Sequence, residues 1–171
     1  MPSPRQQNDV AADLHCAFVC CDDSSCKRSA QVPIPIATSA PRKFLACCPD
    51  TDCPPSDAAE ANGTYYRTCE ENPPGDGDFL THAELGLRPD GDACLRCGLS
   101  VFETQVGAAN MYRDVKRRNP EVPFPSFVVE LSLAPNDGVL KQTNKPPHYT
   151  WWMYADTERR AKAGNMVKCS R

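Results

Sequence analysis

Hydrophobic residues between Leu99 and Arg118 recur at spacings of three and four positions. Such a stripe is typical of an amphipathic helix that packs one face on a core. It comprises Val101, Phe102, Val106, Ala109, Tyr112 and Val115. Asn119-Pro120 ends the pattern, because proline disfavours a helical conformation of the residue before it. The spacing therefore predicts a helix over residues 99–118.

Three later segments have the β-branched and aromatic content of strands: Ser126–Leu133, Val139–Thr143 and Tyr149–Tyr154. Pro135-Asn136-Asp137-Gly138 separates the first two and is typical of a turn. A short polar helix over Asp156–Lys162 follows, with Gly164 as its end. Residues 99–171 are therefore predicted to be a small α+β region with a helix, a three-stranded antiparallel sheet and a short second helix.

The N-terminal half carries a repeated cysteine pattern instead of periodic segments. Residues 18–26 align with residues 45–53 as apolar-x-Cys-Cys-x-Asp-Ser/Thr-x-Cys, and Ser29 matches Ser56 at the same offset. The repeat, over 18–29 and 45–56, predicts two equivalent turns, each entered by a short apolar strand, that hold cysteines ready to share a metal. Chance similarity between two cysteine-containing turns is the alternative.

Composition shows how such a chain is held together. The 171 residues include 17 Pro and 11 Cys, which indicates many loops and a core partly replaced by cross-links. A coiled coil, a membrane channel and a large α/β enzyme are excluded.

Charge is unevenly distributed along the chain. Residues 1–93 hold seven Lys and Arg against fifteen Asp and Glu, whereas residues 94–171 hold twelve Lys and Arg against seven Asp and Glu. We therefore expect a flexible N-terminus over 1–14, a Cys-rich zinc-binding region over 15–98 and the α+β region over 99–171 packed on it.

The first residues predict an intracellular protein that does not enter a membrane. Pro2, Arg5, Asp9 and Asp13 interrupt the apolar run that a secretory signal needs. In a reducing compartment, clustered cysteines are more often zinc ligands than disulfides. A mature secreted protein with a disulfide framework is the alternative, although eleven cysteines would leave one thiol unpaired.

Cys94-Leu95-Arg96-Cys97-Gly98 is the most specific metal motif. Two cysteines two residues apart form a tight turn suited to tetrahedral zinc, and glycine tolerates the backbone angle that closes the turn. With the predicted helix after it, this segment resembles zinc-ribbon and treble-clef modules. A thioredoxin-type redox pair is disfavoured, because residues 88–93 form a loop and not a buried strand.

The remaining ligands must come from elsewhere in the Cys-rich region. The candidate zinc ligands are Cys16, Cys20, Cys21, Cys26, Cys47, Cys48, Cys53, Cys69, Cys94, Cys97, His15 and His82. Four ligands per site predict two to three zinc ions in knuckle-like or treble-clef-like turns. The sequence does not fix which residues share an ion, and Cys169 is expected to be a free thiol.

His82-Ala83-Glu84 followed by Cys94-x-x-Cys97 resembles the zinc signature of cytidine deaminases. The eleven residues 83–93 are too few for the helix and strand of that family, and Ala93 stands where the family has proline. A zinc deaminase or hydrolase is therefore disfavoured. We expect no catalytic residues, with Glu84 solvated.

Basic side chains are the only sign of a partner. They are Arg113, Lys116, Arg117, Arg118, Arg159 and Arg160, and the last two follow the aromatic residues Trp151, Trp152 and Tyr154. This combination suits nucleic acid, although cations at helix ends also complement the helix dipole and the net charge is −3. The sequence thus favours a zinc-stabilised, non-enzymatic binding or adaptor protein with a protein partner, and nucleic acid as the other partner considered. A secreted, disulfide-rich, effector-like protein is the rival class.

Overall fold

The computed structural model describes residues 41–121, 125 and 127–169, all of which belong to one compact unit. The first copy of the repeat and the candidate ligands His15, Cys16, Cys20, Cys21 and Cys26 lie outside these residues. Within the described part of the chain, no helix is both long and apolar enough to cross a membrane.

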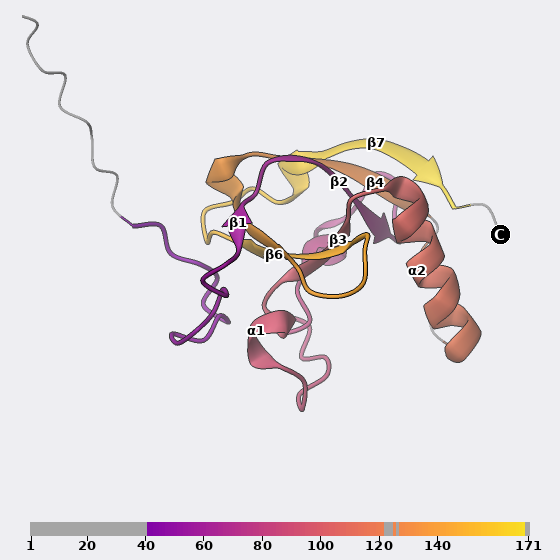
Figure 1. The fold of residues 1–171 in the computed structure, drawn as a ribbon. Coiled ribbons are helices and arrows are strands. Elements are labelled where there is room, and N and C mark those ends of the chain that lie inside the picture. Colours follow the sequence, from indigo (N-terminus) through magenta and orange to yellow (C-terminus); the bar gives the residue numbers. More distant parts are fainter. Residues whose placement is uncertain (1–40, 122–124, 126, 170–171) are drawn as a thin grey trace, which may run out of the picture. The chain divides into compact units, whose positions relative to one another are not determined.

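A seven-stranded antiparallel sheet forms the framework (Figure 1), in the order β1-β5-β6-β3-β2-β4-β7. The strands are β1 Ala59–Glu60, β2 Gly63–Cys69, β3 Leu99–Phe102, β4 Phe127–Leu133, β5 Gly138–Gln142, β6 His148–Met153 and β7 Ala163–Lys168. The helices are α1 Ala93–Arg96 and α2 Gln105–Arg118, with 3-10 turns at Asp76–Phe79, Pro135–Asp137 and Arg160–Lys162. The C-terminal region is thus a small α+β domain with an antiparallel sheet and few helices.

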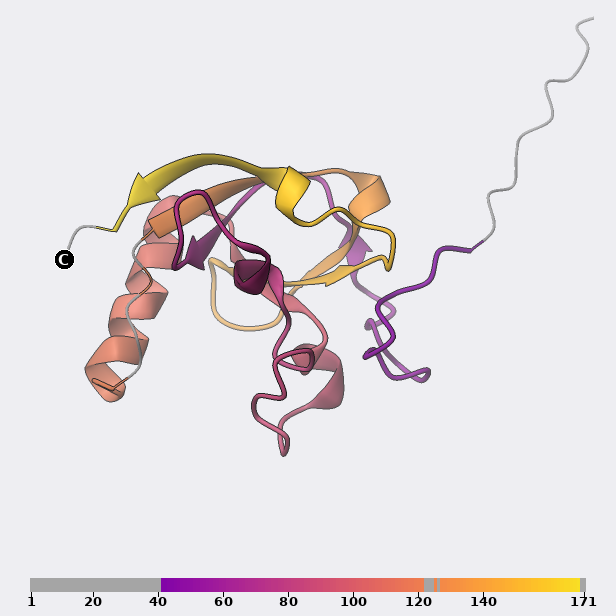
Figure 2. The ribbon, with the colours of Figure 1, turned by 180° about the vertical axis from the view of Figure 1, so that it is seen from behind.

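The sheet bends over one apolar core. Strands β4 and β7 lie on one side of it and β3 and β6 on the other, as both ribbon views show (Figures 1 and 2). Val129, Leu131 and Leu133 of β4 point inward at alternate positions, and so do Trp151 and Met153 of β6. All five are nearly or fully buried, as expected when successive residues of a strand face opposite sides of a sheet.

Helix α2 covers the other face of strands β2, β3 and β4. Ala108 of the helix packs there on Phe102 and Val128 in a second apolar cluster. The side chain of Thr104 caps the helix by accepting a hydrogen bond from the Gly107 N–H at 3.0 Å.

The predicted helix over 99–118 is correct only from Gln105 onward. Its first four residues form β3, which pairs with β6 from Leu99↔Trp151 to Phe102↔His148. Leu99 and Val101 face the core and Phe102 faces α2. Alternate residues are thus buried on opposite faces, which a strand allows and a helix does not. The helix expected directly after the cysteine turn is therefore replaced by a strand, unlike the treble-clef arrangement.

The last predicted helix is also shorter than expected. Only Arg160–Lys162 form a 3-10 turn, and Gly164, expected to end a helix, lies within β7. Strand β7 forms because the chain after the turn pairs with β4 along the edge of the sheet. Strands β1 and β2, which precede the predicted boundary at residue 98, belong to the same sheet as the strands after it.

Candidate metal centre

Three cysteines from two distant segments meet beside the sheet. The Sγ atoms of Cys47, Cys48 and Cys97 all lie within 4.8 Å of one another, close enough to share one metal ion. We call this group the thiol centre. Cys47 and Cys48 sit on a turn closed by a 2.9 Å hydrogen bond from the Cys48 N–H to the Leu45 carbonyl. The predicted ligands of the second repeat and of the C-x-x-C motif are thus brought together in part.

Helix α1 positions Cys97, which is its C-cap residue. The side chain of Asp92 caps the start of the helix, accepting from the Leu95 N–H at 2.8 Å. The Trp152 indole Nε1–H donates to the Cys94 carbonyl at 2.9 Å. Because Trp152 is fully buried, this bond fixes the cysteine turn to β6.

Gly98 is required for a reason other than the one predicted. Its backbone φ is not in the left-handed region, which among the described glycines is occupied by Gly63, Gly86 and Gly138. A side chain at position 98 would instead overlap Thr150 Cγ2 and lie 3.3 Å from the Trp151 carbonyl oxygen. The glycine therefore permits close approach of the cysteine turn to β6.

The thiol centre is an environment that disfavours free thiolates. Burial, followed by the neighbouring Cys47, raises the pKa of the Cys48 thiol to about 11. Burial, followed by the neighbouring thiols of Cys47 and Cys48, also raises the pKa of Cys97. Without a metal, the thiols of Cys48 and Cys97 therefore stay protonated at neutral pH. A metal cation would replace these protons, and three sulfur donors suit a borderline or soft ion such as zinc.

Cys53 and Cys94, both predicted zinc ligands, form a disulfide with Cα atoms 5.5 Å apart. Sulfur atoms joined in this way offer no thiolate to a metal. The Cys97 N–H donates to the Cys94 carbonyl at 3.1 Å, so Cys94 lies one helical turn before the thiol centre. The disulfide is therefore adjacent to the three free thiols.

The remaining described candidates do not join the thiol centre. Cys69 is buried in the main core, where burial raises its thiol pKa to about 12. Cys169, predicted to be a free thiol, is free and packs on the cluster beneath α2. His82 lies in a cleft elsewhere, and burial lowers its pKa.

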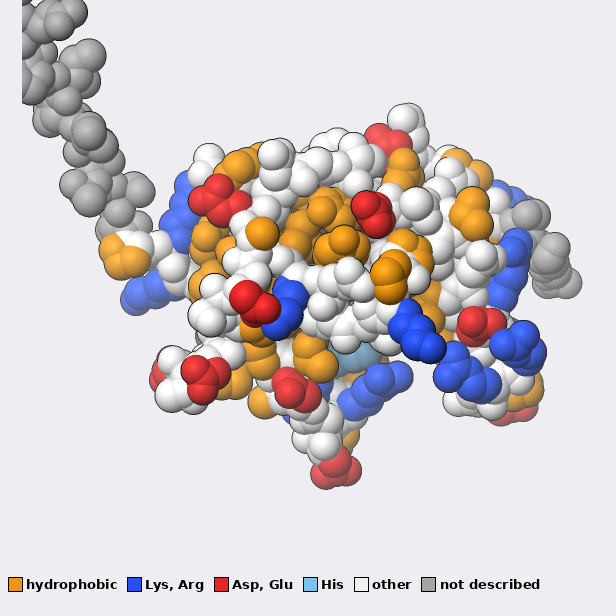
Figure 3. Space-filling view, viewed as in Figure 1, with side chains coloured by type: hydrophobic (Ala, Val, Ile, Leu, Met, Phe, Trp, Pro, Cys, Tyr) orange, Lys and Arg blue, Asp and Glu red, His pale blue; other side chains and the backbone are white. Residues whose placement is uncertain are grey.

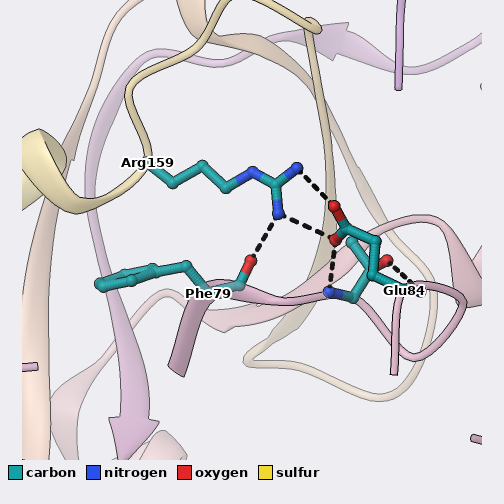
Figure 4. Close-up of polar contacts among 4 residues, drawn as sticks. Phe79, Glu84 and Arg159 are labelled. Carbon is teal, nitrogen blue, oxygen red and sulfur yellow. Dashed lines mark hydrogen bonds and ion pairs between the residues drawn. The ribbon is translucent and has the colours of Figure 1, made fainter. Parts of the chain in front are cut away.

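Glu84 is engaged in a structural contact (Figure 4) and is not simply solvated as predicted. Its two carboxylate oxygens each accept a 2.8 Å hydrogen bond from the Arg159 guanidinium, which also donates to the Phe79 carbonyl. Oε2 accepts a further bond from the Thr81 N–H at 2.8 Å. Burial acts to raise the pKa of Glu84, but the bonds from Arg159 and Thr81 outweigh it and lower the pKa. A carboxylate held in this way is poorly suited to shuttle protons.

A serine–histidine contact was not apparent from the sequence. His148 Nε2 lies 3.1 Å from Ser100 Oγ across the β3–β6 pair, and His148 Nδ1 lies 3.4 Å from Thr143 Oγ1. The register of β3 against β6 brings Ser100 and His148 together, and no local sequence motif indicates this contact. A threonine hydroxyl at Nδ1 supplies no negative charge to stabilise an imidazolium, unlike the carboxylate of a catalytic triad.

The predicted basic residues differ in their surroundings. Lys116, Arg117 and Arg118 form the last turn of α2, where Lys and Arg side chains gather at the lower right of Figure 3. Arg159 is paired with Glu84, and Arg160 lies 3.8 Å from Asp76. The adjoining Trp151 and Trp152 are fully buried, so their rings are not available to stack on bases.

Comparison with protein-family models, with curated proteins and with solved structures finds no match to this chain.

Proposed function

We propose that this protein is a non-enzymatic binding protein whose Cys-rich segment is fixed by zinc. The observation that carries the proposal is the thiol centre, in which Cys47, Cys48 and Cys97 approach within 4.8 Å. Zinc would tie the turn at residues 45–48 to helix α1 and so order two loops that are distant in the sequence. Of the two to three ions predicted, this centre accounts for one.

A structural zinc site takes four ligands, and the thiol centre offers three. Cys94 is the nearest further cysteine along the chain, one helical turn before Cys97. A cellular dithiol can reduce the Cys53–Cys94 disulfide, and the reduction supplies two electrons and two protons and yields two thiols. We propose that Cys94 then completes the site, in keeping with an intracellular, reducing location.

The partner we propose is another protein. Exposed apolar side chains lie on the segment that leads to the thiol centre, with Leu85, Leu87 and Leu95 each between 44% and 48% exposed. Loops ordered by zinc that present apolar side chains are suited to bind a protein surface. Nucleic acid receives less support, because the tryptophans beside Arg159 are buried.

The disulfide favours a second candidate, a secreted effector-like protein. In that case the bond between Cys53 and Cys94 would persist and further cysteines would pair. Counting free thiols in the protein as purified without reductant separates the two classes.

Hydrogen exchange with and without a zinc chelator tests the proposal. Removing zinc should speed exchange over residues 43–58 and 82–98, whereas strands β4 to β6 should stay protected by their own core. Cys48→Ser should reproduce the effect, and Cys169→Ser, which alters a free thiol away from the centre, should not. Exchange that is indifferent both to the chelator and to Cys48→Ser would overturn the proposal.

A further inference from the structure

A cleft of about 660 Å³ opens on the face of β3 and β6 that is turned away from the main core. Ser100 and Phe102 of β3 and His148 and Thr150 of β6 line it, alternating with the residues that fill the core. Helix α2 forms one wall, and residues of the segment from Leu80 to Arg96 form the opposite wall. This volume is typical of sites for small ligands.

A partly buried arginine, Arg67, lines the cleft where strands β2 and β3 separate. Strands β2 and β3 pair only at Tyr66↔Phe102. Beyond that point Arg67 bridges them, donating to the Ser100 carbonyl at 2.8 Å and to the Asp78 carbonyl at 2.7 Å. Burial lowers its pKa to about 10, so the guanidinium remains charged at neutral pH.

Two further arginines, Arg88 and Arg96, line the same cleft. Arg96 is held by backbone carbonyls, donating to Leu87 O at 3.0 Å. His82 lines the same cleft, and burial, followed by the positive charges of Arg88, Arg67 and Arg96, lowers its pKa.

Five other cations of the described residues form ion pairs, whereas the negative charge of Asp78 acts on Arg67 from beyond ion-pair distance. Arg117, Arg159, Arg160, Lys141 and Lys162 each pair with a carboxylate. No ion pair within the described part of the chain involves the three cleft arginines. The only carboxylate in the lining belongs to Asp92, which caps helix α1. In a protein of net charge −3, the cleft is a concentrated positive site.

The wall opposite these charges is apolar. Ala108, Met111 and Val115 of α2 line it together with Phe102. A ligand that contacts both walls would combine an anionic group with an apolar or weakly polar body.

We propose that this cleft binds a small organic phosphate of the nucleotide class. The phosphate would lie against Arg67, Arg88 and Arg96, because planar guanidinium groups match the geometry and charge of phosphate oxygens. The ring system would lie along the apolar wall of α2. This inference goes beyond the proposed zinc-dependent adaptor role and rests on it in one respect, because the proposed zinc orders the segment that carries Arg88 and Arg96.

Isothermal titration calorimetry of the full chain with adenosine 5′-monophosphate tests the inference. Arg88→Gln removes an exposed charge of the cleft that makes no hydrogen bond within the described residues, and should weaken binding about tenfold. The control Arg117→Gln removes a guanidinium from the exposed end of α2 and should leave binding unchanged. Adenosine and inorganic phosphate, which each carry half of the ligand, should both bind more weakly.

Three results would overturn the inference. The first is no heat of binding with up to about 1 mM nucleotide, the weak end of the range for specific small ligands. The second is equal weakening by Arg88→Gln and Arg117→Gln, which would indicate a general response to net charge. The third is binding of inorganic phosphate as tightly as of the nucleotide, which would leave the apolar wall without a role.

Discussion

Replacing Glu84 with Gln is predicted to lower the free energy of unfolding by about 2 kcal/mol. The carboxylate and the Arg159 guanidinium share two hydrogen bonds of 2.8 Å, and their side chains are 29% and 17% exposed. Gln keeps one oxygen that can accept from the Thr81 N–H but loses the negative charge. The 3-10 turn ending at Phe79 and the segment that carries Arg159 would then be joined less firmly.

The magnitude follows from the partial burial of the pair. Exposed ion pairs contribute about 0.2–1 kcal/mol. Breaking a fully buried pair costs about 3–5 kcal/mol. Glu84 and Arg159 lie between these limits, and their geometry is bidentate, which strengthens charge-assisted hydrogen bonds.

Double-mutant cycles in urea measure this coupling against a matched pair. Glu84→Gln with Arg159→Gln should give a coupling energy of about 1.5–2 kcal/mol. Asp114→Asn with Arg117→Gln should give about 0.3–0.5 kcal/mol, because that pair lies three residues apart on an exposed helix face. Equal coupling energies in the two cycles would refute the reasoning from burial.

Two further predictions follow from the described contacts. Gly98→Ala should lower the free energy of unfolding, measured by thermal unfolding, by about 1–3 kcal/mol, because the added methyl group overlaps Thr150. The control Gly77→Ala, with open space around the added methyl group, should lower it less. Similar losses for the two variants would contradict the close approach of Gly98 to β6. Burial lowers the pKa of His148 below its usual value of 6.5, so near and below that pH the unfolded chain binds more protons than the folded chain. The contribution of the neutral, buried His148 to stability is therefore fully present above about pH 6.5 and is lost as the pH falls. Urea midpoints between about pH 7.5 and 5 should fall less for His148→Gln than for the unaltered protein, and parallel curves would count against this assignment.

The sequence predicted strands β4 and β6, most of whose residues are buried. Strand β4 contains a run of valine and leucine, and β6 contains two tryptophans, so each was apparent from composition. Strand β7 was missed because it is an edge strand whose side chains are mostly exposed. Its formation depends on pairing with β4, which a local pattern does not reveal.

The start of α2 was misplaced for a related reason. Leu99, Val101 and Phe102 fit the first turn of a helix as well as a short strand, because four residues do not separate the two periods. Thr104 was the available signal, since a threonine before Gln105 is a favourable N-cap.

The thiol centre was predicted in part. Adjacent cysteines in one turn and a C-x-x-C motif in another indicated a shared metal, and Cys47, Cys48 and Cys97 do meet. The pairing of Cys53 with Cys94 was not predicted, because it joins residues 41 positions apart and depends on how the loops pack. The cleft was missed as well, because Arg67, Arg88 and Arg96 are brought together only by the tertiary fold.

The zinc content of the protein purified with a reductant tests the central claim most directly. Elemental analysis beside native mass spectrometry should find at least one zinc ion per chain. Cys97→Ser should lower the content by one ion, and Cys169→Ser should leave it unchanged. The contradicting result is a native chain that contains no metal. If such a chain, purified without reductant, is also lighter than its sequence mass by about ten hydrogens, it holds five disulfides and belongs to the secreted class.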